Sequence, residues 1–391
     1  MRAALAGVFL LAPALALAND GTVQQDVVGG TNAAAGKWPD VAAMLFDGQQ
    51  ACTGTLIAPN VVITAGHCND PALTTVLVGT NALDKPGAGE TIDVAKRVEF
   101  PSSQTSEDLT IVVLKGNSRF APRAVATGWV KLDVLNGKAV EIVGYGAVDV
   151  NASQFKPELQ EAMSTITDAN CTLRTSDCQP SVVPGGELAA GGMGIDSCNG
   201  DSGGPLYLLT DYGTFLVGVT SRGYNSSPTP CGDGGIYVRP DKVIDQLEAM
   251  AGVALTRGPE PQFDKLSATG GDAAETKIDA NDPKSDSHTF ELTTPPTAGT
   301  ARVRDDGAVR VCTNATATAA TDSLVVTITD KKDTTRKLAV TIPIAIAPGT
   351  ATGCDVDAFS EGDGGCCNSG RGGEGALALA GIVLLAIRRR R

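Results

Sequence analysis

The stretch DSCNGDSGGP at residues 196–205 decides how this chain is interpreted. Its ten residues contain two aspartates, one cysteine, two serines and three glycines. Runs rich in Gly, Ser and Asp usually form ordinary loops. The rest of the sequence therefore has to show whether Ser202 is a nucleophile, and what Asp196 and Asp201 do beside it.

Composition and the first residues indicate an exported, acidic protein. The chain has 391 residues, and its net charge of −13 disfavours a nucleic-acid-binding protein, which would be basic. Residues 1–18 combine one arginine, an apolar run and a small-x-small ending, which is typical of a signal peptide. The ten cysteines are then expected to form disulfides. Since the only histidines are His67 and His288 and no Cys-x-x-Cys pair occurs, we expect no metal and no other cofactor.

Short β-rich runs fill the chain between residues 27 and 251. Gly, Pro, Asn and Asp turns separate them, a pattern that predicts an all-β barrel or sandwich. The run ends in DKVIDQLEAM (241–250), whose apolar residues share one face at helical spacing and predict a single C-terminal helix. The clearest strand candidates are VVITA (61–65), TTVLVG (74–79), LTIVVL (109–114), VEIVGYG (140–146) and FLVGVTS (215–221).

The remaining chain divides into three parts. Residues 257–281 contain Gly, Pro and Asp with little apolar patterning and are predicted to be a linker after a first domain at 27–256. Residues 282–353 alternate apolar and polar side chains, as in a small immunoglobulin-like β-sandwich, with Cys312 and Cys354 as its staple. Residues 354–391 form a Gly- and Cys-rich tail. Its apolar run at 376–387 is predicted to be a short transmembrane segment, below the roughly 20 residues that span a bilayer comfortably.

Four motifs in the first domain point to one kind of chemistry. Taken singly, His67 reads as a core histidine, Asp108 as a surface acid and Ser202 as a turn residue. Together, their order and their spacings of 41 and 94 positions resemble those of the chymotrypsin/trypsin family of serine endopeptidases. The motifs are VVGG (27–30), TAGHC (64–68), SEDLTIVVL (106–114) and DSCNGDSGGP (196–205).

This resemblance implies a fold and a mechanism. The fold would be two six-stranded antiparallel β-barrels followed by the C-terminal helix. A serine hydroxyl needs an adjacent base, so His67 would accept the proton of Ser202, and Asp108 would orient the histidine ring. The backbone N–H groups of Gly200 and Ser202 would form the oxyanion hole.

The resemblance also implies activation by proteolysis. Val27 would become the new N-terminus, and its α-amino group would pair with Asp201. The preceding residue is Asp26 rather than Arg or Lys, so a trypsin-like enzyme should not activate itself there. We therefore expect residues 19–26 to be a propeptide that a different, activating protease removes.

The position of Asp196 predicts specificity. It stands six positions before Ser202, where the trypsin branch of the family carries the acid at the base of its S1 pocket. Ser221, Gly223 and Gly235 match the pocket walls, and an open pocket with a buried carboxylate favours Arg or Lys at P1. Ser221 would also contact the aspartate of the triad.

The cysteines and two further positions complete the family comparison. The resemblance implies disulfides Cys52–Cys68 and Cys198–Cys231, and a local Cys171–Cys178 bridge is predicted where the family pattern is missing. Arg222 replaces a common aromatic residue, which predicts a preference for acidic residues beyond P1. The segment NALDKPGAGE after Gly79 lacks the acid pattern of the family's calcium loop, so no calcium is predicted.

The tail resembles the C-terminal sorting signals of myxobacterial surface proteins. It has a Gly-rich spacer, the pair Cys366-Cys367, a short apolar span and four arginines. The resemblance implies cleavage near the cysteines by a surface-sorting machinery, and a secreted or cell-surface product; a simple membrane anchor is the alternative. The expected partners are therefore this machinery, the activating protease, and protein or peptide substrates with Arg or Lys at P1.

Two rival functions stay open at this point. One is a catalytically silent protease homologue that acts as a surface adhesion or binding protein. The other is an esterase with the same triad, which is weaker because a G-x-S-x-G nucleophile elbow belongs on an α/β sheet rather than in an all-β chain.

Overall fold

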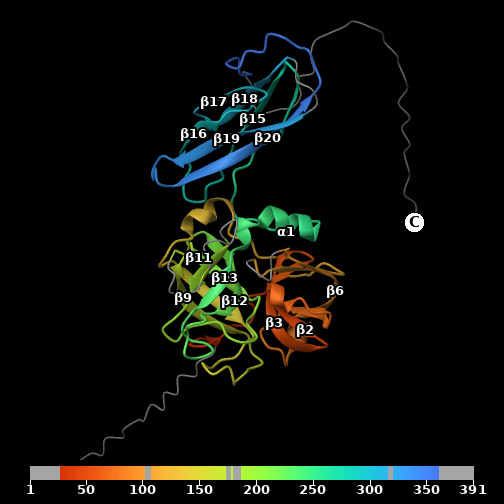
Figure 1. The fold of residues 1–391 in the computed structure, drawn as a ribbon, viewed down its shortest axis with the longest axis vertical. Coiled ribbons are helices and arrows are strands. Elements are labelled where there is room, and N and C mark those ends of the chain that lie inside the picture. Colours follow the sequence, from red (N-terminus) through yellow and green to blue (C-terminus); the bar gives the residue numbers. More distant parts are fainter. Residues whose placement is uncertain (1–26, 102–106, 173–177, 179–185, 316–319, 361–391) are drawn as a thin grey trace, which may run out of the picture.

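A computed structural model of the chain describes residues 27–101, 107–172, 178, 186–315 and 320–360 (Figure 1). The predicted signal peptide, the propeptide with Asp26, the pair Cys366-Cys367 and the apolar run of the tail lie outside the described residues. Among the described residues, no helix is long and apolar enough to cross a membrane. The fold consists of two β-barrels, a short helix and a β-sandwich.

The first barrel is a closed ring of six antiparallel strands. In spatial order the strands are β2 (Val41–Phe46), β3 (Gln49–Ala58), β4 (Val61–Thr64), β7 (Thr110–Leu114), β6 (Glu90–Glu99) and β5 (Leu73–Val78). Strands β2, β4, β5 and β7 are four to six residues long and rich in Val, Leu and Ile, so closing the barrel removes these side chains from water. The predicted strand VVIT, for example, is buried at every position.

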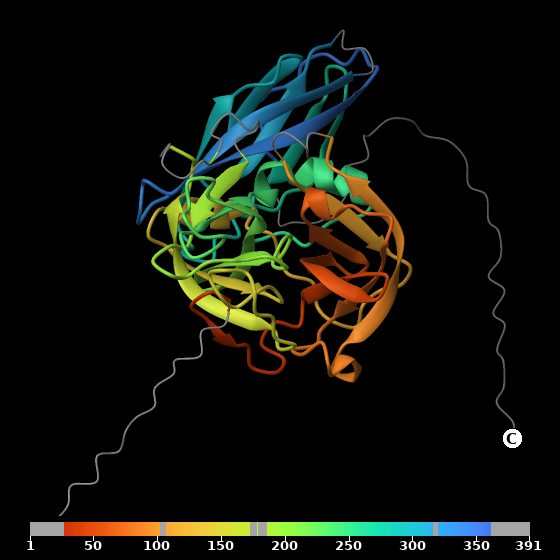
Figure 2. The same ribbon diagram turned by 60° about the horizontal axis from the view of Figure 1, so that its bottom comes forward.

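The second barrel has the same number of strands and closes where β8 pairs with β9. The short strand β1 (Thr31–Asn32) is added outside, against β9. The prediction of two six-stranded antiparallel barrels is thus confirmed, and Figure 2 shows them side by side. In spatial order the strands are β9 (Gln160–Asp168), β10 (Glu187–Ala190), β13 (Gly235–Val238), β12 (Gly213–Gly223), β11 (Pro205–Thr210) and β8 (Ala139–Gly144).

Helix α1 (Ile244–Ala251) follows the second barrel and packs against β7 of the first. Ile244, Leu247 and Ala251 are buried, as the helical spacing predicts. The helix starts later than the predicted 241–250 because residues 240–242 form a 3₁₀ turn that begins at a proline. Gly252 ends it in the left-handed conformation, φ +75°.

The sandwich contains two sheets. One has four strands, with β14 parallel to β20, and the other has three antiparallel strands. The larger sheet consists of β14 (Leu266–Thr269), β20 (Lys337–Ala347), β19 (Ala320–Asp330) and β16 (His288–Thr294); the smaller one consists of β15 (Ala273–Lys277), β18 (Ala308–Thr313) and β17 (Gly299–Val303).

The prediction of a linker at 257–281 is wrong for its second half. Strands β14 and β15 lie within it and belong to the sandwich, which therefore begins at Leu266 rather than at 282. Both strands are short and rich in Ala, Ser and Thr, so they carry almost no apolar alternation. Pairing with β20 and β18, far along the chain, creates them.

The sandwich is held to the second barrel through one tryptophan. Trp129 lies in the 3₁₀ segment η3 (Gly128–Asp133), is fully buried and belongs to the apolar core of the sandwich. Its Nε1–H donates to the carbonyl oxygen of Ala280 at 2.6 Å. Figure 1 accordingly shows the sandwich seated on one end of the protein, next to α1.

Asp133, at the end of the same segment, adds charge to this contact. Its carboxylate accepts hydrogen bonds from Lys284 Nζ at 2.8 Å and from Arg336 at 3.2 Å, both in the sandwich. Tyr212 of the barrel donates to its other oxygen at 2.6 Å. The interface thus combines an apolar anchor with a shielded ion-pair cluster.

All four predicted disulfides are present. The chain forms the bonds Cys52–Cys68, Cys171–Cys178, Cys198–Cys231 and Cys312–Cys354. The last one joins β18 to the segment that follows the final strand, so it closes the sandwich.

Candidate active site

The sheet register brings His67 and Asp108 together. Strands β4 and β7 are antiparallel neighbours with Thr64 opposite Thr110, so the residues after β4 and before β7 emerge at the same end of the barrel. His67 lies in the 3₁₀ turn Gly66–Cys68, and its Nδ1 is 2.8 Å from Asp108 Oδ2. The backbone N–H of His67 donates to Asp108 Oδ1, also at 2.8 Å. The ring is therefore held in one orientation.

This pair shifts both pKa values. Burial alone would raise the pKa of Asp108, but hydrogen bonds from His67 and from Ser221, together with the charge of the histidine, hold it below its usual range. The hydrogen bond to Asp108 raises the pKa of His67 above its usual value, against the effect of burial. Asp108 therefore stays ionised and stabilises a protonated His67.

The loop that carries Ser202 packs directly against the histidine turn. The carbonyl oxygen of Ser202 accepts a hydrogen bond from Thr53 N–H at 2.9 Å and lies 3.7 Å from Cys68 Sγ. Gly203 allows this approach, because a Cβ there would lie 2.0 Å from Thr64 Oγ1, and its φ is +81°. The site therefore joins the two barrels, with histidine and aspartate from the first and serine from the second.

Two backbone N–H groups beside Ser202 are available to a ligand. Within the described part of the chain, the N–H groups of Gly200 and Ser202 have no acceptor, whereas Asp201 N–H, between them, donates to a carbonyl. Ala147 N–H donates to the carbonyl oxygen of Asn199 at 2.8 Å. Because N–H and C=O of a trans peptide point in opposite directions, this bond turns the Gly200 N–H away from Ala147. Such a pair of donors can stabilise an oxyanion.

Asp196, six positions before Ser202, is almost fully buried. Its Oδ2 accepts hydrogen bonds from the N–H groups of Gly232 at 2.9 Å and Gly234 at 3.2 Å. Its Oδ1 is buried and has no hydrogen-bond partner among the described residues. Burial raises the pKa of Asp196 to about 6. Among the described residues, one carboxylate oxygen of Asp196 is thus left without a hydrogen-bond partner.

The other predicted pocket residues lie on strands β12 and β13. Gly223 on β12 and Gly235 on β13 are paired across the sheet. A Cβ on Gly235 would lie 3.2 Å from Asp196 Oδ1, whereas one on Gly223 would meet only a carbonyl oxygen at 3.5 Å. Ser221, two residues before Gly223, donates its hydroxyl to Asp108 Oδ2 at 2.7 Å. Strand β12 is therefore connected directly to the histidine–aspartate pair.

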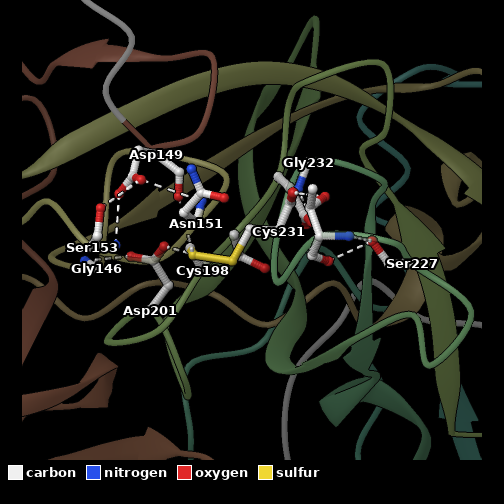
Figure 3. The surroundings of a disulfide bond; sticks show 12 residues. Gly146, Asp149, Asn151, Ser153, Cys198, Asp201, Ser227, Cys231 and Gly232 are labelled. Carbon is white, nitrogen blue, oxygen red and sulfur yellow. Dashed lines mark hydrogen bonds between the residues drawn. A yellow bond between two sulfur atoms is a disulfide. The ribbon is translucent and has the colours of Figure 1, made fainter.

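Asp201 faces the interior rather than the pocket. Its carboxylate is fully buried and accepts hydrogen bonds from Gly146 N–H at 2.7 Å and Cys198 N–H at 2.8 Å, as Figure 3 shows. Burial raises the pKa of Asp201 to about 7. A Cβ at Gly144 would lie 2.0 Å from Asp201 Oδ1, so glycine is required there. No cationic side chain among the described residues contacts this carboxylate.

The residues after the predicted cleavage point lie beside the same loop. Val27 and Val28 are both buried, and the carbonyl oxygen of Val28 accepts a hydrogen bond from Asp196 N–H at 3.1 Å. The start of the first domain is thereby attached to the loop that runs from Asp196 to Ser202. Figure 3 shows the disulfide Cys198–Cys231 that fastens the middle of this loop.

Comparison with known proteins decides the family. The sequence model of the family described as Trypsin matches residues 27–246, which is more than half of the chain. The chain belongs to the trypsin family. It is therefore a serine endopeptidase, a trypsin-like hydrolase. The sandwich lies outside the matched residues.

Relatives agree over the same region. Trypsin delta of Drosophila melanogaster is 28% identical over 228 residues, covering 55% of this chain and 88% of its own. Chymotrypsin-like elastase family member 1 of Canis lupus familiaris is 35% identical and covers 50% and 80%. Kallikrein-8 of Homo sapiens is 29% identical and covers 64% and 96%. A solved structure of neuropsin, a serine protease expressed in the limbic system of mouse brain, has a TM-score of 0.48 at 25% identity, over 56% of this chain and 97% of that one.

The trypsin domain departs from the sequence-based expectation at Arg222. Its guanidinium forms two hydrogen bonds, of 2.7 and 3.0 Å, with the buried carboxylate of Glu187 on β10. A compensated charge does not attract an acidic substrate residue, so the predicted preference for acids beyond P1 loses its basis. Glu187 could not be found from the sequence, because it lies 35 positions away and belongs to no motif.

Three further residues of the trypsin-family site were missed. Ser197 follows Asp196, and its Oγ accepts a hydrogen bond from the hydroxyl of Tyr237 at 3.3 Å. A Cβ at Gly235 would lie 3.1 Å from this oxygen. The position of Ser197 inside the motif was the only signal. Gln50 and Thr53 both donate side-chain hydrogen bonds to the carbonyl oxygen of Gly200. They lie about 150 positions from Gly200 in the sequence, so no local sequence pattern indicates the contact.

A hollow of about 400 Å³ lies beside Gly200 and is also lined by Gln50.

Proposed function

We propose that this enzyme cleaves peptide bonds after Arg or Lys, with Ser202 as nucleophile, His67 as general base and Asp108 as its orienting partner. The observation that carries the proposal is the bonded His67–Asp108 pair, packed against a serine loop that presents two free N–H donors. Each part of an acyl-transfer site is therefore supplied by this chain.

The proposed reaction proceeds in two halves. Ser202 Oγ attacks the carbonyl carbon while His67 Nε2 takes the hydroxyl proton, and the N–H groups of Gly200 and Ser202 stabilise the negative oxygen. The carbon–nitrogen bond then breaks, and His67 returns the proton to the leaving amine. A water molecule, deprotonated by the same histidine, hydrolyses the acyl-enzyme and restores the serine.

The preference for Arg or Lys is supported by Asp196. Its Oδ1 is buried without a partner among the described residues, and an uncompensated buried carboxylate is costly until a cation pairs with it. Ser197 adds a hydroxyl beside the same space, and Gly223 and Gly235 keep the walls free of side chains. A guanidinium or ammonium group at P1 therefore gains more here than a neutral side chain.

Activation by cleavage before Val27 is supported by Asp201. This fully buried carboxylate has two N–H donors and no cation among the described residues, and Val27, at the start of the domain, is also buried. Cleavage would create an α-amino group that can neutralise it and stabilise the loop carrying Gly200 and Ser202. Because Asp26 precedes the cleavage point, the activating protease must differ from this enzyme in specificity.

Export belongs to the same proposal. The N-terminal signal sequence and four disulfides are consistent with an oxidising compartment outside the cytoplasm. The tail would direct the enzyme to the cell surface or to release through a sorting machinery. Proteins or peptides with Arg or Lys at P1 would be its substrates.

One experiment tests the catalytic assignment. A fluorophosphonate probe should label the enzyme that begins at Val27 with one equivalent, and Ser202→Ala should abolish the labelling. Profiling on a peptide library should then enrich Arg or Lys at P1. Absence of labelling in folded enzyme with this N-terminus would instead favour a silent homologue that acts by binding.

A further inference from the structure

Thr53 contacts both residues that flank Asp201. It lies on β3, next to Cys52, and is fully buried. Its backbone N–H donates to the carbonyl oxygen of Ser202 at 2.9 Å, and its Oγ1 donates to the carbonyl oxygen of Gly200 at 2.9 Å. A single residue of the first barrel therefore contacts both Gly200 and Ser202, whose N–H groups have no acceptor in the described part of the chain.

The hydroxyl of Thr53 is itself fixed by its surroundings. Its Oγ1 accepts a hydrogen bond from Tyr145 N–H at 3.3 Å, so that its own hydrogen is directed to Gly200. The carbonyl oxygen of Thr53 accepts a hydrogen bond from Thr64 Oγ1 at 2.7 Å. The residue has no freedom to turn away from the loop.

Gln50 supports the same carbonyl group. Its Nε2 donates to the carbonyl oxygen of Gly200 at 3.0 Å and to that of Cys52 at 3.2 Å. Gly200 has φ +98°, a conformation that a mobile glycine loop leaves easily. The hydrogen bond from Ala147 fixes the peptide plane before Gly200. The hydrogen bonds from Thr53 and Gln50 fix the peptide plane after it.

We infer that Thr53, assisted by Gln50, positions the oxyanion donors of this enzyme. The inference rests on the proposed function, in which the N–H groups of Gly200 and Ser202 stabilise the negative oxygen. Thr53 touches neither substrate nor reacting atoms, so it is a positioning residue. Its hydroxyl affects the tetrahedral state more than the bound substrate, because the charge on the oxygen develops only there.

Thr55 provides a matched control on the same strand. It is two residues along β3 and equally buried, but its Oγ1 has no hydrogen-bond partner among the described residues. Replacing either threonine by valine keeps the side-chain shape and removes one hydroxyl. Only at position 53 does that hydroxyl hold the nucleophile loop.

The test compares Thr53→Val with Thr55→Val in the full chain cleaved before Val27. For Thr53→Val we expect kcat to fall roughly tenfold with KM within about twofold, less than the roughly 10²–10³-fold loss on removing a direct donor. The second measurement uses a peptide aldehyde, which adds Ser202 O–H across its C=O, and the matching peptide alcohol, which cannot. The inhibition-constant ratio of alcohol to aldehyde should fall by the same factor as kcat.

Two further variants keep the test decisive. Thr53→Ser retains the hydroxyl and should restore kcat and the inhibitor ratio. Gln50→Leu changes a half-buried side chain at the barrel edge, so folding is not at risk even where Thr53→Val fails to fold. It should lower kcat in the same direction by a smaller factor. Thr55→Val should leave both quantities unchanged.

The inference is overturned if Thr53→Val and Gln50→Leu both keep kcat and the ratio within twofold of the parent enzyme. It is also overturned if alcohol and aldehyde binding weaken equally, since that would mean a general disturbance of the cleft. Failure of the proposed function looks different: the parent enzyme would then neither react with a fluorophosphonate nor form the aldehyde adduct.

Discussion

At the scale of single residues, the site contains three carboxylates whose surroundings give them different tasks. Asp108 is held ionised by His67 and Ser221, so its pKa lies low. Asp196 and Asp201 receive only backbone N–H donors, and burial raises their pKa values to about 6 and about 7. In the proposed function, Asp108 orients a base, whereas Asp196 and Asp201 each bind a cation.

The raised pKa of Asp196 predicts a pH-dependent pocket. A P1 cation binds the ionised carboxylate, so affinity should be full above pH 6 and fall about tenfold per pH unit below it. The inhibition constant of benzamidine, measured from pH 4.5 to 8, checks this.

Asp196→Asn serves as the control for that titration. Loss of one partner of a buried charge pair costs about 2–5 kcal/mol, so benzamidine should bind far more weakly at every pH. The hydrogen bond to Asp108 raises the pKa of His67, so this histidine also gains a proton as the pH falls, and any slope that persists in the Asp196→Asn variant belongs to the histidine. A parent curve that is flat down to pH 5 would contradict the assignment.

Asp201 predicts a pH-dependent stability difference between the two forms of the chain. Its folded pKa of about 7 exceeds the ordinary value, so its contribution to stability is present at low pH and is lost as the pH rises through 7. An α-amino group at Val27 removes that loss. In the Ser202→Ala background, the melting temperature of the cleaved form should exceed that of the uncleaved form by a margin that grows from pH 5 to 7.5. A constant margin would argue against the Val27–Asp201 pair.

At the scale of elements, β12 and β13 would form the wall of the proposed P1 pocket, because their glycines are paired in register. Gly223 is opposite Gly235, and Gly235 approaches Asp196 and Ser197 closely. Gly235→Val should therefore place methyl groups over the carboxylate. We expect kcat/KM for an Arg substrate to fall by at least about a hundredfold, while an Ala substrate is cleaved nearly as before.

Gly116→Val provides the control for that change. A Cβ at Gly116 meets no atom within 4 Å, so the same substitution there should leave both substrates unaffected. Equal losses for Arg and Ala substrates in Gly235→Val would mean that the strand pair had been distorted rather than the pocket filled.

The strands also show what the sequence could and could not predict. Apolar runs such as 61–64 and 110–114 were recognisable because burial in a barrel demands Val, Ile and Leu. Strands β14 and β15 were not, because distant pairing partners create them rather than their own pattern. The site divides in the same way: His67, Asp108 and Ser202 lie in motifs, whereas Thr53 and Glu187 act through contacts with distant parts of the chain.

At the scale of the whole molecule, the apolar core of the sandwich includes a residue of the trypsin domain, whereas the barrels have apolar cores of their own. Trp129 packs in the core of the sandwich although it belongs to the trypsin domain. Asp133, in the same segment, forms ion pairs with Lys284 and Arg336 of the sandwich. The sequence ATGWVKLD (126–133) does not indicate this contact between the domains, because its partners lie about 150 to 200 positions later in the chain.

This arrangement predicts that Trp129 stabilises the sandwich without affecting catalysis. Trp129→Ala leaves a cavity in the sandwich core and deprives the Ala280 carbonyl of its donor, so the free energy of unfolding should fall by about 3–5 kcal/mol. Because its partners belong to the sandwich, kcat/KM at a temperature where the chain stays folded should be unchanged.

Trp129→Phe separates the two contributions to that loss. It fills most of the cavity but lacks the indole N–H, so it should lose only about 1–3 kcal/mol, the cost of an unsatisfied buried carbonyl. Denaturant unfolding monitored by limited proteolysis of the sandwich measures both variants. If Trp129→Ala unfolds at the same denaturant concentration as the parent, the two domains are connected only by the chain; if its kcat/KM falls as well, the sandwich supports the active site through the barrel.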